Sequence, residues 1–247
     1  MAEAALATRA PAAAGAPLLS VQGLEAWYGE SHVLHGITFD VRMGEVVTLL
    51  GRNGAGKTTT LKSIIGIIGK RRGSVVFGGV ETIRLASRQI ARLGIGYVPE
   101  ERGIFSSLNV EENLNLPPQV KPGGLSPQQI FELFPNLRER LSSQGTKLSG
   151  GEQQMLAIGR ILRTGANFLL LDEPTEGLAP VIIEQIGRTI ARLKREGFTI
   201  ILVEQNFRFA QTVADRHYVV EQGRVIDMIP NAELDRNIDK LHGYLGV

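Results

Sequence analysis

A glycine-rich stretch, GRNGAGKT at residues 51–58, has the residue types and spacing of a phosphate-binding loop. It follows an apolar run and precedes a helix-forming segment, so backbone N–H groups can surround a phosphate at a helix N-terminus. Lys57 can reach the β- and γ-phosphates of a nucleotide, and the Thr58 hydroxyl can ligate Mg²⁺. The predicted nucleotide-binding residues of the loop are Gly51, Arg52, Asn53, Gly54, Ala55, Gly56, Lys57, Thr58 and Thr59.

A second stretch, FLLLDE at residues 168–173, reads as a buried strand that ends in two carboxylates. Asp172 can hold Mg²⁺ through water, and Glu173 can polarise an attacking water as a general base. An acidic pair after a strand is common, and it becomes informative because the same chain carries a phosphate loop. We therefore predict Glu173 and Lys57 as catalytic residues, with Thr58 and Asp172 at the metal.

A third stretch, LSGGEQQ at residues 148–154, places two glycines before a helix. Ser149 is a natural N-cap, and the glycines leave backbone donors accessible to an anion. A flexible loop is the alternative interpretation of this composition. The predicted second anion site consists of Leu148, Ser149, Gly150, Gly151 and Glu152.

The elements that must position these motifs alternate between strands and helices, which predicts a mostly parallel sheet with helices packed on it. Antiparallel stretches near both ends of the chain suggest an additional β layer. Residues 87–165 form a plausible helical insertion, with a helix that starts behind Ser126 and Pro127. Gly197 can end a later helix, and a hairpin is predicted to turn at Gln222 and Gly223.

Composition limits the classes of function. The chain has 247 residues, 43% of them hydrophobic, a net charge of +2 and no cysteine. The charge is too small to indicate a nucleic-acid surface, and the lack of cysteine excludes disulfides and thiolate chemistry. No apolar run approaches the ~20 residues that span a bilayer. We expect residues 1–17 to form a disordered alanine-rich tail, and the protein to be cytosolic or held at a membrane by partners.

Taken together, the three motifs resemble those of ATP-binding cassette (ABC) ATPases, whose signature is LSGGQ where this chain has LSGGE. The resemblance covers residues 18–247 and implies ATP and Mg²⁺ as ligands. It also implies an α/β P-loop NTPase fold with an antiparallel β subdomain and a helical subdomain between the phosphate loop and the acidic strand. The signature would face the nucleotide of a second cassette, so that two chains pair head to tail.

The resemblance assigns further residues and exposes departures from the common pattern. Tyr28 falls where an aromatic ring stacks on adenine, although Tyr28 or Trp27 could instead belong to the core. Glu100 stands where a glutamine usually contacts Mg²⁺ and water, and its oxygen can still ligate the metal. Gln205 stands at the histidine position and can donate a neutral hydrogen bond to the γ-phosphate. Ala179 replaces the usual aspartate.

Longer stretches narrow the resemblance. YVPEERGIF, ELFPNLRERL, LSGGEQQMLAIGRIL, DEPTEGLAP and VEQN are similar to the LivF-type ATPases of branched-chain amino acid importers. This implies a peripheral ATPase at the cytoplasmic face of the inner membrane. The implied partners are a second ATPase chain, permease subunits and, indirectly, a solute-binding protein, but no nucleic acid. The resemblance favours a related but different second ATPase, with a homodimer of the isolated chain as the alternative. ATPases of urea importers share many of these stretches. The motifs are also compatible with a weakly hydrolysing nucleotide sensor, or with a soluble cassette of DNA repair or translation.

The base assignment makes the first testable prediction. We expect Glu173→Gln to abolish nearly all ATP hydrolysis while ATP still binds and pairs the chains, because the substitution removes only the proton acceptor. Steady-state phosphate release and ATP-dependent dimer formation measure the two effects. Normal turnover in this variant would refute the assignment.

Overall fold

The computed structural model describes residues 16–245, so most of the tail predicted at residues 1–17 lies outside the described residues. The centre of the fold is a six-stranded sheet with the order β10-β9-β3-β8-β7-β6. All its neighbouring pairs are parallel except β9 and β10. Its strands are β3 (Val46–Leu50), β6 (Ile95–Val98), β7 (Phe168–Asp172), β8 (Thr199–Glu204), β9 (Arg216–Glu221) and β10 (Arg224–Pro230).

The strands at the centre of this sheet are buried on both faces, which is why they read as continuous apolar runs. Alternate residues of β7 enter different cores. Phe168 and Leu170 pack toward the antiparallel sheet, and Leu169 and Leu171 pack toward the helices. The mostly parallel α/β fold predicted from the sequence is confirmed by this arrangement.

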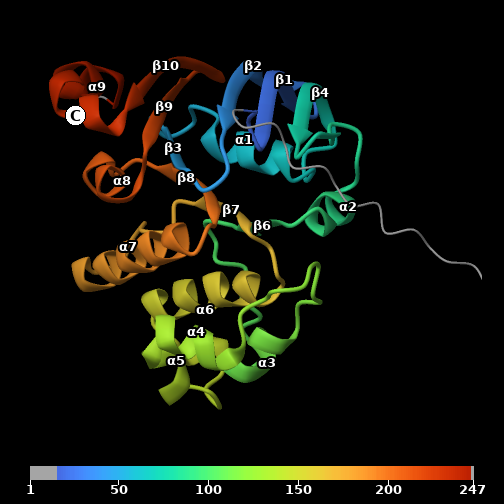
Figure 1. Ribbon diagram of the computed structural model, residues 1–247, viewed down its shortest axis with the longest axis vertical. Coiled ribbons are helices and arrows are strands. Elements are labelled where there is room, and N and C mark those ends of the chain that lie inside the picture. The colour runs from blue at the N-terminus through green and yellow to red at the C-terminus, as the bar shows by residue number, and fades with distance from the viewer. Residues whose placement is uncertain (1–15, 246–247) are drawn as a thin grey trace, which may run out of the picture.

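Of the antiparallel stretches expected to form an additional β layer, the one near the end of the chain instead extends the central sheet as β9 and β10. The stretches nearer the start form a separate four-stranded antiparallel sheet with the order β2-β1-β4-β5. In Figure 1 its strands lie at the opposite end of the molecule from the helices α3 to α6. The helix that follows the phosphate loop packs between this sheet and the central one, where Leu61 and Ile64 join their shared core. The strands are β1 (Leu19–Tyr28), β2 (Ser31–Val41), β4 (Lys70–Phe77) and β5 (Val80–Glu81), and the helix is α1 (Lys57–Ile64).

The remaining helices lie between residues 87 and 245 of the chain. Figure 1 shows α3 to α6 gathered in one layer, with α7 between this layer and α8. The helices are α2 (Ser87–Arg92), α3 (Val110–Asn115), α4 (Pro127–Leu133), α5 (Pro135–Glu139), α6 (Gly150–Arg163), α7 (Pro180–Arg195), α8 (Phe207–Val213) and α9 (Ile238–Leu245). Short 3-10 turns occur at Gly145–Lys147, Asn231–Glu233 and Asp235–Asn237.

The helical layer between the phosphate loop and the acidic strand spans fewer residues than the expected range 87–165. Its helices α3 to α6 run from Val110 to Arg163, whereas α2 packs through Ile90 into the core shared by the two sheets and Ile95–Val98 forms the edge strand β6 of the central sheet. This four-residue run is too short for its sequence pattern to separate a strand from a helix. Parallel pairing with β7 makes it a strand.

Local signals in the sequence predicted several boundaries correctly. Ser126 accepts a hydrogen bond from the backbone N–H of Gln129 and caps α4, with Pro127 at its first position. Gly197 follows the C-terminus of α7 with φ +87°. The β9–β10 hairpin turns at Gln222 and Gly223, which both have positive φ, as a two-residue turn requires.

Candidate functional site

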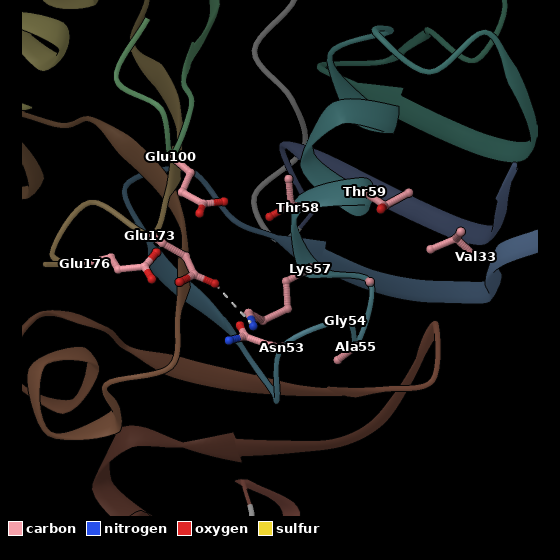
Figure 2. A pocket seen from close by; sticks show the side chains of 11 residues that line it. Val33, Asn53, Gly54, Ala55, Lys57, Thr58, Thr59, Glu100, Glu173 and Glu176 are labelled. Atoms are coloured by element: carbon pink, nitrogen blue, oxygen red, sulfur yellow. Dashed lines mark ion pairs between the residues drawn. The ribbon is translucent and has the colours of Figure 1, made fainter. Parts of the chain in front are cut away.

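The phosphate loop joins β3 to α1 and borders a cavity of about 360 Å³. Gly54 and Gly56 have φ of +78° and +105°, which favour glycine. A Cβ at Gly56 would also lie 2.9 Å from the Leu34 side chain, so the loop has no room for a larger residue there. The lining residues are Val33, Asn53, Gly54, Ala55, Gly56, Lys57, Thr58, Thr59, Glu100, Glu173 and Glu176 (Figure 2).

The Lys57 ammonium is almost fully buried at the base of the loop, with 4% of its side chain exposed. It donates hydrogen bonds to the carbonyl oxygens of Gly51 at 2.8 Å and Arg52 at 3.1 Å. Its Nζ also lies 3.4 Å from a carboxylate oxygen of Glu173. These are oxygen partners that phosphate oxygens can replace, because an ammonium binds anions as a compact point charge.

Thr58 and Asp172, which were both predicted as metal ligands, lie in contact although they are far apart in the sequence. Thr58 Oγ1 donates to Asp172 Oδ1 at 2.9 Å. A hydroxyl and a carboxylate oxygen in contact are ligands that suit Mg²⁺, and the metal can bind where this hydrogen bond now closes the pair. Burial raises the pKa of Asp172, while the bonds from Thr58 and Tyr97 favour its ionised form.

The predicted base, Glu173, is held in an uncommon backbone conformation. Its φ is +45°, a left-handed value that is rare for a residue with a side chain and that costs energy. Its backbone N–H donates to the carbonyl oxygen of Val203, on β8, at 3.0 Å. This hydrogen bond attaches the turn that follows β7 to the neighbouring strand β8. Both carboxylate oxygens have partners, since Lys57 lies beside Oε1 and Gln205 Nε2 donates to Oε2 at 2.8 Å.

The structure gives Gln205 a contact that its sequence position did not reveal. The sequence suggested a donor to the γ-phosphate, and the structure places the amide on the carboxylate of Glu173. The connection arises because Gln205 follows the last residue of β8 and Glu173 follows the last residue of β7, its parallel neighbour. In this arrangement the amide can orient the base.

Two further carboxylates face the phosphate loop across the cavity. Figure 2 shows Glu100, Glu173 and Glu176 on one side and the loop on the other. Burial, and then the negative charges of Glu173 and Glu100, raise the pKa of Glu176. Glu176 was not predicted from the sequence, although its place three residues after the base could have signalled it. A metal contact from Glu100 stays a prediction.

The aromatic residues at the end of β1 have separate environments. Tyr28 is 48% exposed, so it does not belong to the core. Trp27 is half-buried and stacks on His32 with ring centroids 4.3 Å apart. Tyr28 is therefore accessible for stacking on adenine, and that role stays a prediction.

The predicted signature forms the N-terminus of α6, and its residues do not line the cavity of their own chain. Ser149 caps the helix by accepting from the backbone N–H of Glu152 at 3.3 Å. Glu152 returns the contact by accepting from the backbone N–H of Ser149 at 2.7 Å, and Arg140 pairs with its other oxygen. The glutamate that departs from LSGGQ thus completes a capping box.

The structure adds Tyr97, on β6, to the site. Its hydroxyl donates to Asp172 Oδ2 at 2.9 Å, so Asp172 is held by Thr58 on one oxygen and by Tyr97 on the other. Burial and the charge of Asp172 raise the pKa of Tyr97, which keeps the phenol protonated as a donor. No local pattern in the sequence predicts this contact, because it depends on the pairing of β6 with β7.

Substitutions at Gln205 distinguish two possible roles of its amide, which are to orient the Glu173 carboxylate and to contact the γ-phosphate of the nucleotide. We expect Gln205→Ala to lower kcat roughly tenfold with little change in KM for ATP, because a hydrogen bond to a charged group is lost. Gln205→His should retain more activity, since it keeps a donor. A large rise in KM for Gln205→Ala would instead favour the γ-phosphate contact, and wild-type kinetics would show that the amide is a spectator.

Substitution of Tyr97 tests its support of the metal ligand. We expect Tyr97→Phe to raise the Mg²⁺ concentration needed for half-maximal hydrolysis roughly tenfold, as loss of a hydrogen bond to a metal ligand often does. Titration of activity with Mg²⁺ at saturating ATP measures this. Tyr218→Phe is the matched control, because its hydroxyl bonds to Asp40 and not to the site. Equal Mg²⁺ requirements in both variants would contradict the role.

Comparison with known proteins supports the same assignment. Residues 34–176 match the family described as ABC transporter. The chain is 44% identical over 238 residues to the high-affinity branched-chain amino acid transport ATP-binding protein BraG of Pseudomonas aeruginosa, covering 93% of this chain and all of BraG. It is 37% identical to the probable branched-chain amino acid transport ATP-binding protein LivF of Archaeoglobus fulgidus, covering 84% of this chain and 90% of LivF.

A solved structure described as the ATP-binding subunit of an ABC transporter superposes with a TM-score of 0.77 and 30% identity. The match covers 93% of this chain and all of that structure. The predicted P-loop NTPase fold of the ABC type is thereby confirmed. With a phosphate loop, an acidic pair and a capped signature helix in place, the chain belongs to the ABC transporter family, as one of its ATP-binding cassettes.

Proposed function

We propose that the chain is the ATP-hydrolysing subunit of an importer for branched-chain or closely related amino acids. The observation that carries the proposal is the cavity in which Lys57, Thr58, Asp172 and Glu173 converge. The 44% sequence identity to BraG, which extends over the whole length of BraG, supports the choice of solute class.

The residues around the cavity would have separate roles in ATP hydrolysis. The loop backbone and Lys57 would bind the β- and γ-phosphates of ATP, and Tyr28 would stack on adenine. Thr58, Asp172 and Glu100 would hold Mg²⁺, which neutralises phosphate charge. Glu173 would accept the proton of the attacking water, and Gln205 would keep its carboxylate directed at that water.

The signature requires a second cassette. None of its residues lines the cavity of the same chain, so Ser149 and the glycines of α6 would contact the nucleotide of a partner chain. We propose a related but different ATPase chain as that partner, with permease subunits and a solute-binding protein completing the importer. The complex would place this chain at the cytoplasmic face of the inner membrane. Within residues 16–245, no helix combines the length and apolar character of a membrane span.

Isolation of the complex from native membranes tests this function. We expect the tagged full chain to retain permease subunits, a second cassette and a solute-binding protein. Proteoliposomes that contain this complex should accumulate leucine, isoleucine or valine with ATP inside and binding protein outside. The same complex with Glu173→Gln should not accumulate them, because its base is removed.

Other outcomes of this experiment contradict the proposal. Uptake of urea or another amide in place of these amino acids would move the chain to a related importer. Retention of permeases without any ATP hydrolysis would favour a nucleotide sensor. Absence of all membrane subunits would remove the transport assignment.

A further inference from the structure

A buried carboxyl group beside the catalytic turn has no part in the chemistry proposed above. It belongs to Glu204, the last residue of β8, which is 3% exposed. Its Oε1 accepts a hydrogen bond from the Thr175 hydroxyl at 2.7 Å. Its Oε2 accepts a longer one, 3.4 Å, from the backbone N–H of Asn206.

This carboxyl group is held without a cation. No ion pair within residues 16–245 includes Glu204. Burial raises the pKa of Glu204 to about 7, the bond from Thr175 opposes this rise, and the charge of Glu173 adds to it. A buried carboxyl without a counter-ion is costly, so a residue chosen only for packing would be apolar.

The partners of Glu204 belong to the two segments that meet at the base. Thr175 lies two residues after Glu173, in a turn closed by the backbone bond from Glu176 N–H to the Glu173 carbonyl at 3.2 Å. Asn206 directly follows Gln205, whose amide donates to the Glu173 carboxylate. The Glu204 carboxyl group therefore connects the turn that carries Glu173 with the segment that carries Gln205.

We infer that Glu204 is a positioning residue for hydrolysis, which fixes the carboxylate of Glu173 and the amide of Gln205 relative to each other through Thr175 and Asn206. The inference rests on the proposed ATP hydrolysis. The side-chain hydrogen bonds of Glu204 reach Thr175 and Asn206, and the residue does not line the cavity, so it would act through the base. Small displacements of a catalytic group lower the rate without weakening ground-state binding.

Four single variants of the full chain and one double variant test this role by separating kcat from KM for MgATP. Thr175→Val keeps the shape and removes the hydroxyl, and we expect kcat to fall roughly tenfold with KM unchanged within about twofold. Thr175→Ser keeps the hydroxyl and should restore kcat. Glu204→Gln keeps a neutral acceptor and should retain activity, whereas Glu204→Leu should lose at least as much kcat as Thr175→Val, because it also removes the acceptor for the Asn206 N–H. The double variant Thr175→Val, Glu204→Leu should be no slower than Glu204→Leu alone, because that substitution already removes the contact with Thr175.

Thr189→Val is the matched control. Thr189 is also buried, and its hydroxyl donates to the Gln185 carbonyl on α7, away from the base. This variant should keep wild-type kcat. If Glu204→Leu does not fold, Thr175→Val decides alone, since it removes only a hydroxyl. Wild-type kcat in Thr175→Val, a parallel loss of ATP affinity, or additive losses in the double variant would overturn the role.

Hydrogen exchange of the nucleotide-free chain gives a readout that does not depend on hydrolysis. Thr175→Val should speed exchange of the backbone amides of Glu173 and of residues 175–178 relative to the wild type and to Thr189→Val. Unchanged exchange there would also overturn the inference. A wild-type chain that shows no hydrolysis would refute the proposed function, and the exchange result would still test the positioning contact.

Discussion

Parallel pairing of β3, β8 and β7 is the constraint on which the site depends. The register aligns Leu50 with Glu204 and Asp172 with Val203, so the three strands end at one edge of the sheet. The phosphate loop, the Glu204–Gln205 segment and the acidic pair follow these ends and therefore meet. A shift of register would reverse the faces of the buried side chains, and two hydrophobic cores oppose such a shift.

The charges around the cavity support the proposed binding of Mg²⁺ together with the nucleotide. Lys57 is buried against Glu173, while Glu100 and Glu176 add negative charge at the same cavity. Phosphates would bring more negative charge into this place, and their repulsion with the carboxylates is strong at low dielectric. A divalent cation between Thr58 and Asp172 would offset that repulsion. The loop dipoles alone supply only partial charges.

The residues that depart from the common sequence pattern have different structural roles. Glu152 closes the capping box of α6, so this glutamate contributes to helix stability. Gln205 reaches the base itself and supplies a donor that does not titrate near neutral pH. Both residues are polar replacements at motif positions, yet one contacts a helix end and the other contacts the carboxylate proposed as the catalytic base.

The sequence by itself determined the phosphate loop, the acidic pair, the signature, the α/β class and several element boundaries, because each depends on local spacing, periodicity or capping. It did not determine that Ile95–Val98 joins the central sheet, since a short apolar run fits either kind of element. The contacts of Tyr97 with Asp172, of Gln205 with Glu173 and of Thr175 with Glu204 required the tertiary structure. Each joins side chains from different strands or the turns after them, and strand order and register decide which of these ends lie together.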